Sequence, residues 1–332
     1  MPPIFVVGAP RTGTTLVKTI LNQHSQVHLF DEVHFFERVW DDREHLGDLA
    51  SPMSQTKAIQ RVRDIVRNFG SDKHVADTLT VEVFRRRLME EGRTYPNVLR
   101  ILLQTGAEAQ NADFWGDSSP QDVLYLDTIL NWYPDAKIVC LVRDPRGYLS
   151  SCKNYYRRQV GSYKEKANPF TQSLLWKSYM TAVVEAEDRP YAPSVMRLYY
   201  EDLVTNPEAE VKRLAAHVGV DFESAMLDVG QTNTSFPGQQ EGRGIFATSS
   251  DRWRQELSPT ELWIGEKIYG ETMELLGYER TKLDGGEPPK PDAMELLKLG
   301  AVLPARAYNH IFNSHKPVKL SKVKRVFSLF RS

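Results

Sequence analysis

The sequence predicts an α/β fold with a central parallel sheet between two layers of helices. Short apolar runs rich in β-branched residues, at positions 4–7, 137–142 and 195–200, alternate with amphipathic segments of helical periodicity. The first run is followed by a glycine loop and a helix, and the second leads directly into a helix start, as parallel strands joined by crossover helices do. These observations predict a three-layer α/β/α sandwich.

The helices follow from local patterns. After the first strand, residues 14–21 place Leu16, Ile20 and Leu21 at helical spacing. A helix starts at Pro145, where proline suits the first turn. Further helices are predicted at residues 54–70, 81–111, 122–132, 207–218 and 259–277.

Composition limits the classes of function. Of 332 residues, 41% are hydrophobic and 26% charged, as in an ordinary soluble protein, and the net charge of -1 gives no reason to expect a nucleic-acid partner. Two cysteines and eight histidines without ligand spacing predict a reducing compartment and no metal. The chain has no charged leader before its first strand and no apolar run near the roughly 20 residues that span a bilayer, so we expect a cytoplasmic protein.

A change in composition marks the end of the main domain. The stretch 284–292, DGGEPPKPD, is typical of a linker, so we predict a domain over residues 1–283 and a tail over 284–332. The segment 296–332 holds eight Lys or Arg and no acidic residue, and apolar residues recur in it at helical spacing. Such a tail would contact a membrane surface or a partner, or would pack on the domain.

A glycine-containing loop joins the first strand to the first helix. It reads GAPRTGTT over residues 8–15, so free backbone N–H groups and the positive end of the helix would hold an anion. Arg11 adds a positive charge, and Thr14 and Thr15 add hydroxyl donors. A plain strand-to-helix turn is the alternative to this phosphate-binding loop.

The loop differs from that of a nucleotide kinase. The kinase signature has a lysine directly after its second glycine, where this chain has Thr14. That lysine neutralises the β- and γ-phosphates, whereas Arg11 lies inside the loop. A donor with a shorter phosphate chain therefore fits better than a triphosphate with magnesium.

A second anion-binding signal follows the strand at 137–142. Arg143 stands at the carboxyl edge of the sheet, where open α/β sheets bind ligands, and Ser151 lies on the helix that follows. The two side chains would bracket a second phosphate. The alternative for Arg143 is a salt bridge to Asp144 or Asp135.

The two signals together resemble the sulfotransferases that use 3′-phosphoadenosine 5′-phosphosulfate (PAPS). In that family a GxPRSGTT loop holds the 5′-phosphosulfate, and an arginine with a serine eight residues later holds the 3′-phosphate. The resemblance spans residues 4–280 and includes a YEDL segment that begins at Tyr200. It implies a P-loop-type fold, PAPS as co-substrate and no metal. The implied donor contacts are Arg11, Thr12, Gly13, Thr14, Thr15, Arg143, Ser151 and Tyr200.

The segment DEVHFF, residues 31–36, is similar to one in the glycosaminoglycan branch of the family, whose base is a glutamate as in the tyrosylprotein branch. This resemblance implies that Glu32 is the catalytic base, with Arg11 stabilising the phosphosulfate charge. Glu32 would otherwise be a surface carboxylate at a helix start capped by Asp31. His34 is the rival base.

Two further segments bear on the site. Relatives of the glutamate type carry a lysine in a GDKTP-like segment, but residues 116–120 read GDSSP here, so Ser118 supplies no charge. The stretch 238–252 resembles the loop that covers the nucleotide, which makes Ser249 and Arg252 candidate donor contacts. Its alternative is a surface loop before a helix that starts at Ser258 and Pro259.

The function expected from these features is sulfuryl transfer to an acceptor hydroxyl. The glutamate branch favours a glycan or glycolipid precursor, and a secondary metabolite or lipid is the second choice. Two other classes stay open: a P-loop nucleotide kinase, and a PAPS-binding pseudoenzyme that the serine at position 118 would explain.

Overall fold

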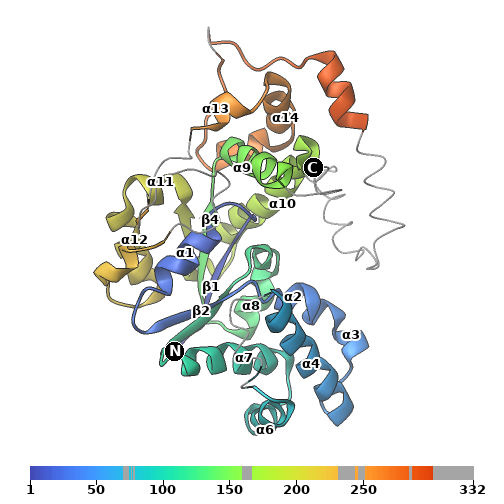
Figure 1. The fold of residues 1–332 in the computed structure, drawn as a ribbon, viewed down its shortest axis with the longest axis vertical. Helices are drawn as coiled ribbons and strands as arrows, with labels where there is room; N and C mark the ends of the chain where they lie inside the picture. Colours follow the sequence, from blue (N-terminus) through green and yellow to red (C-terminus); the bar gives the residue numbers. More distant parts are fainter. Residues whose placement is uncertain are drawn as a thin grey trace. The chain divides into compact units, whose positions relative to one another are not determined.

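The computed structural model describes residues 1–69, 75, 77, 79–158, 167–230, 244–245, 251–283 and 286–301 (Figure 1). They form two compact units. The first consists mainly of Met1–Val142 and Ala186–Asn233, and the second mainly of Arg143–Glu185 and Ala247–Ser332. The predicted division at residue 284 falls within the second unit and stays a prediction.

The first unit is built on a five-stranded parallel sheet of order β2-β3-β1-β4-β5, which confirms the predicted α/β architecture. Because β1 lies between β3 and β4, the connections out of β1 and β3 run in opposite directions across the sheet, and the carboxyl end of β1 lies where such folds bind ligands. The strands are β1 (Ile4–Gly8), β2 (Val27–Asp31), β3 (Phe114–Ser118), β4 (Lys137–Val142) and β5 (Val195–Tyr199).

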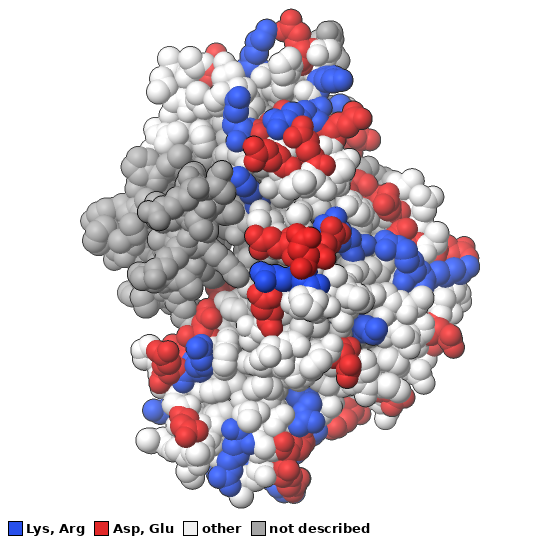
Figure 2. Space-filling model, turned by 180° about the vertical axis from the view of Figure 1, so that it is seen from behind, with Lys and Arg blue, Asp and Glu red and all other residues white. Residues whose placement is uncertain are grey.

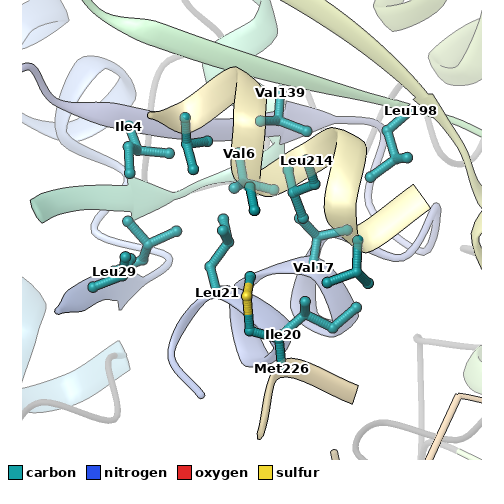
Figure 3. Close-up of a cluster of buried hydrophobic side chains, with 14 of the residues drawn as sticks. Ile4, Val6, Val17, Ile20, Leu21, Leu29, Val139, Leu198, Leu214 and Met226 are labelled. Atoms are coloured by element: carbon teal, nitrogen blue, oxygen red, sulfur yellow. The ribbon is translucent and has the colours of Figure 1, made fainter. Parts of the chain in front are cut away.

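One face of the sheet packs against α1 (Thr14–Leu21) and α12 (Pro207–Val218). Figure 3 shows this core: Leu29 of β2 and Val6 of β1 point toward Leu21 of α1 and Leu214 of α12. Because alternate residues of a strand face opposite sides, residues 27, 29 and 31 of β2 all point toward α1. The side chain of Asp31, the last residue of β2, is therefore directed toward α1.

Helices also cover the opposite face of the sheet and its edges. Figure 1 shows α7 and α8 on the side of the sheet away from α1. The remaining helical elements of this unit are α2 (Phe35–Arg38), η1 (Trp40–Asp42), α3 (Arg43–Leu46), α4 (Pro52–Phe69), α6 (Val81–Glu91), α7 (Tyr95–Ala109), η2 (Pro120–Tyr125), α8 (Leu126–Trp132), η4 (Ala186–Asp188), η5 (Ala192–Ser194), α11 (Tyr200–Thr205) and η6 (Ser224–Leu227).

The second unit is helical. It contains α9 (Pro145–Arg157), α10 (Pro169–Glu185), α13 (Trp253–Glu256) and α14 (Pro259–Leu275). Its core holds Trp176 of α10 against Tyr269 of α14, with ring centroids 5.4 Å apart. The predicted start of α14 is confirmed: the Ser258 hydroxyl accepts from the Glu261 amide, and the Glu261 carboxylate accepts from the Ser258 amide.

Two of the predicted helices need correction. Residues 81–111 form two helices, because Gly92 has φ +110° and Thr94 caps a new helix that begins at Tyr95. The segment 122–132 begins as a 3-10 helix and becomes α-helical only at Leu126. The strands β2 and β3 were not predicted.

The described surface carries charges of both signs. In Figure 2, Lys and Arg side chains lie next to Asp and Glu side chains over the visible face. Within the part of the chain that the structure describes, no cluster of three or more His, Cys, Asp or Glu is arranged to hold a metal ion. Among the same residues, no helix has the length and apolar character needed to cross a membrane.

Candidate active site

The predicted anion-binding loop connects β1 to α1. Arg11 and Gly13 both have positive φ, 72° and 111°, so the chain turns sharply before the helix begins at Thr14. Within the described residues, no side chain caps α1 and its first turn holds no acidic residue. The first amides of a helix have no acceptor inside it, so this turn presents N–H groups and positive helix potential without a competing carboxylate.

Thr12 and Tyr200 shape this loop. The Thr12 amide and hydroxyl both donate to the carbonyl of Ala9, at 3.2 and 2.6 Å, which closes the turn from inside. Tyr200, the first residue of α11, lies against Gly13: a Cβ at Gly13 would be 2.8 Å from the Tyr200 ring. The structure thus brings Tyr200, a donor contact implied by the resemblance, against the loop, although 187 positions separate it from Gly13.

Glu32 lies on a short turn between β2 and α2. The alternative in which Asp31 caps a helix is wrong: Asp31 is the last residue of β2, and α2 begins at Phe35. Glu32 and His34 have φ +49° and +50°, and Nε2 of His34 is 3.2 Å from Oε2 of Glu32. The Glu32 side chain is 46% exposed and that of His34 11%, so the carboxylate is the more accessible of the two.

The end of β3 holds this turn in place. The amides of Glu32, Val33 and His34 donate in succession to the Ser118 carbonyl, the Asp117 Oδ1 and the Ser119 Oγ, at 3.2, 3.2 and 2.9 Å. Left-handed backbone at two non-glycine residues is strained and persists only where its surroundings fix it. We call these three bonds the base clamp. They fix the strained backbone that carries the proposed base.

Buried carboxyl groups lie behind the base clamp. Burial raises the pKa of Asp117 to about 6, and hydrogen bonds from Ser119 and Val33 limit that rise. Burial, with the neighbouring charges of Asp117 and Glu37, raises the pKa of Asp122 well above its ordinary value. These two groups therefore hold a proton to higher pH than ordinary carboxyl groups do, which limits the negative charge behind the base clamp.

The second predicted anion site begins where β4 ends. Arg143 is 6% exposed, and its carbonyl accepts from the indole of the buried Trp176 at 3.1 Å. Asp144 caps α9, and both of its carboxylate oxygens accept from the Arg146 guanidinium. Ser151 lies buried on the second turn of α9. One strand-turn-helix segment thus carries both predicted residues.

The remaining predicted contacts are only partly described. Arg252 immediately precedes α13, at the N-cap position, and the adjacent Trp253 stacks against the Arg146 guanidinium at 4.3 Å. Ser249, most of the loop 238–252 and the basic tail from residue 302 lie outside the described residues. The loop, the base turn and Tyr200 belong to the first unit, whereas Arg143, Ser151 and Arg252 belong to the second.

Sequence reasoning missed the residues of the base clamp. Asp117 and Ser119 stand 84 and 85 positions from their partners. The one available signal was the GDSSP segment, which the sequence analysis treated only as lacking the lysine of related enzymes. The structure shows that this segment ends β3 and supports Glu32 and His34.

The profile of the Sulfotransferase family matches residues 2–224. The chain belongs to the sulfotransferase family. Protein-tyrosine sulfotransferase A of Caenorhabditis elegans is 23% identical over 309 residues, which cover 90% of this chain and 72% of the relative. Carbohydrate sulfotransferase 1 of Danio rerio is 22% identical over 331 residues, which cover 83% of this chain and 77% of the relative.

A solved structure shares the fold of this sulfotransferase. The sulfotransferase domain of the Synechococcus PCC 7002 olefin synthase superimposes with a TM-score of 0.56 at 21% identity, covering 84% of this chain and 95% of that one. The family and the enzyme class predicted with the help of the two anion motifs, a sulfotransferase, are thereby confirmed. The acceptor and the role of each site residue are not given by these matches.

Proposed function

We propose that this sulfotransferase transfers the sulfuryl group of PAPS to a hydroxyl of a glycan or glycolipid precursor. The observation that carries the proposal is the strained turn after β2, where Glu32 presents an accessible carboxylate backed by His34 and fixed by the base clamp. A turn held this way places a proton acceptor at the carboxyl edge of the sheet, the edge that also carries the anion-binding loop.

In this proposal, residues of the first unit carry out both the proton transfer and the stabilisation of charge. Glu32 takes the proton of the acceptor hydroxyl while its oxygen forms a bond to sulfur. The bond from sulfur to the bridging phosphate oxygen breaks, and adenosine 3′,5′-bisphosphate leaves with the electron pair. Arg11 and the first amides of α1 hold the phosphosulfate and oppose the charge that develops on it.

Donor selection rests on the second anion site. Arg143 at the end of β4 and Ser151 on α9 would bind the 3′-phosphate, which PAPS and its product carry and ATP lacks. A thermal-shift comparison of adenosine 3′,5′-bisphosphate, ATP and ADP tests this proposal. We expect the bisphosphate to stabilise the protein most. Stabilisation by MgATP alone, or ATP hydrolysis, would favour a nucleotide kinase.

The choice of acceptor rests on the resemblance of residues 31–36 to the glycosaminoglycan branch. The relatives named above act, by their names, on protein tyrosine and on carbohydrate. A panel of oligosaccharides, glycolipids, tyrosine peptides and small phenols, incubated with labelled PAPS, separates these classes. Transfer to the sugars supports the proposal, and transfer only to tyrosine or to small metabolites overturns it.

A PAPS-binding pseudoenzyme is the remaining alternative. It would bind the bisphosphate, because the loop and Arg143 are present, but would transfer no sulfate to any member of the panel. Slow hydrolysis of labelled PAPS, with water as acceptor, is the measurement that separates an enzyme lacking its acceptor from such a protein.

A further inference from the structure

Lys18 is a second cation on the segment that binds the anion. It lies one helical turn after Thr14, and its Nζ is 3.1 Å from Oδ2 of Asp31. The two side chains are 12% and 30% exposed. A long side chain on a helix leans toward the helix N-terminus, so the ammonium group is directed toward the turn that holds the anion. Asp31 directly precedes Glu32, so the charge is held beside the base turn as well.

The sheet register relates this ion pair to position 118. Asp31 of β2 is the direct partner of Ser118 of β3, and paired residues of adjacent strands project from the same face. That face packs against α1, as the contact of Leu29 with the α1 core shows. Lys18, Asp31 and Ser118 therefore share one face, on which Ser118 carries no charge and Lys18 does.

Sulfuryl transfer needs positive charge near the group that departs. As the bond from sulfur to the bridging oxygen breaks, negative charge develops on the phosphate, and preorganised cations that meet this charge are a major source of catalysis. From β1 to the end of α1 the chain carries two cations, Arg11 and Lys18. Arg11 lies inside the loop, whereas Lys18 lies on α1 and faces β2, where it contacts Asp31, the register partner of Ser118 on β3.

The ion pair could instead serve only to dock α1 on β2. Other contacts already dock α1 on β2. The side-chain amide nitrogen of Asn22 donates to the Leu29 carbonyl at 3.0 Å, and the side-chain oxygen of Asn22 accepts from the Leu29 backbone amide at 2.8 Å. Asn22 lies one turn beyond Lys18 on the same side of the helix. A single partly exposed ion pair adds little stability to contacts of this kind.

We propose that Lys18 is a further catalytic residue, whose ammonium group stabilises the phosphate oxygen that leaves sulfur. The acceptor oxygen bonds to sulfur, its proton passes to Glu32, and the departing oxygen keeps the electron pair opposite Lys18. Asp31 holds the ammonium group in this position. This inference rests on the proposed transfer from PAPS and adds to it the cation that Ser118 does not supply.

The test uses Lys18→Met, which keeps an unbranched side chain of similar length, in the full-length protein. Removal of one group that stabilises transition-state charge lowers turnover roughly 10²- to 10³-fold. We expect this loss in sulfate transfer from labelled PAPS, to the acceptor found in the panel or to water. Bisphosphate affinity should change much less, and Lys18→Arg should retain most of the turnover. Lys212→Met, which removes the exposed Glu208 ion pair on α12, is the matched control and should leave turnover unchanged.

Two further variants distinguish a catalytic role of Lys18 from a role in docking α1 on β2. In the Lys18→Met background, Ser118→Lys returns an ammonium group to the same face and should recover at least tenfold in turnover. Asp31→Asn breaks the ion pair but keeps the cation, so it should lose only part of the turnover that Lys18→Met loses, because the ammonium group is still present but less firmly held. A loss equal to that of Lys18→Met means a docking role and overturns the inference. It is also overturned if Lys18→Met keeps turnover within threefold of wild type. If the wild-type protein transfers sulfate neither to an acceptor nor to water, the proposed function itself is wrong.

Discussion

Nε2 of His34 lies 3.2 Å from a carboxylate oxygen of Glu32, and both residues have a left-handed backbone on one turn after β2. Strained backbone of this kind clusters at functional sites and persists where the surrounding contacts fix it. The contact explains how two candidate bases cooperate. In the proposed mechanism the more exposed Glu32 is the base that faces the acceptor, and the buried His34 orients its carboxylate.

Glu32→Gln should lose most turnover. A positioned carboxylate that removes a proton in the transition state is worth roughly 10²- to 10⁴-fold, and glutamine keeps the size and hydrogen bonding of glutamate without its basicity. Sulfate transfer from labelled PAPS measures the loss, and bisphosphate affinity should stay within about 0.5 kcal/mol of wild type. His34→Gln should lose less. Near-normal transfer by Glu32→Gln together with none by His34→Gln would make His34 the base.

Arg143→Ala should weaken binding of adenosine 3′,5′-bisphosphate by about 1.5 to 3 kcal/mol, the scale of a hydrogen bond to a charged group. Ser151→Ala should cost less, because it removes a neutral donor. Calorimetric titration measures both. Arg157→Ala removes an exposed arginine from the same helix and controls for nonspecific attraction. Wild-type affinity in Arg143→Ala would show that the nucleotide site is misplaced.

Gly13→Ala should disrupt the anion-binding loop. The new Cβ would meet the Tyr200 ring at 2.8 Å, and φ of +111° is strained for any residue but glycine. We expect bisphosphate binding to fall below detection and the protein to lose stability on the order of 1–3 kcal/mol. Gly219→Ala is the matched control: φ is +88° there, but nothing lies within 4 Å, so it should lower the melting temperature and leave binding unchanged.

Ser119→Ala should slow turnover without weakening nucleotide binding. Its hydroxyl accepts from the His34 amide at 2.9 Å and donates to Asp117, so the variant opens one bond of the base clamp. A buried amide left without an acceptor costs about 1–3 kcal/mol. We expect roughly a tenfold lower kcat, from the looser turn, with an unchanged Kd for the bisphosphate. Ser173→Ala is the control, since the buried Ser173 hydroxyl has no hydrogen-bond partner among the described residues. An equal fall in kcat in Ser173→Ala would rule out a specific role for Ser119.

The sequence predicted those elements of the fold whose signals are local. Residues 138–142 of β4 are a continuous apolar run, and α9 starts at a proline, so both could be placed from their own residues. The strand β3, FWGDS, contains glycine and aspartate, which strands disfavour. It forms a strand because β1 and β2 flank it on both sides, and this pairing is not encoded in the segment itself.

The same limit applies to the site. Arg11, Gly13 and Thr14 stand within one motif, and Arg143 precedes its helix directly, so short patterns identified them. The base clamp joins the turn after β2 to the end of β3, and Lys18 meets Asp31 only because α1 crosses back over β2. Such pairings depend on strand order and register, which no motif in this sequence specifies.

Asp117→Asn should change how stability depends on pH. Burial raises the pKa of Asp117 from 3.8 to about 6, so the folded protein binds a proton here more tightly than the unfolded chain. The stability due to this proton is fully present below pH 3.8 and is lost as pH rises through about 6. Asparagine does not titrate and still offers Oδ1 to the Val33 amide.

Melting temperatures measured between pH 4 and pH 7 should therefore converge for the two proteins at the acid end. At pH 7 Asp117→Asn should be the more stable, by an amount on the order of 2 kcal/mol. Asp135→Asn, at an exposed position before β4, is the control and should follow the wild-type curve. Parallel curves for wild type and Asp117→Asn over this range would mean that Asp117 is ionised in the folded protein, and the base turn would then lie above a fixed negative charge.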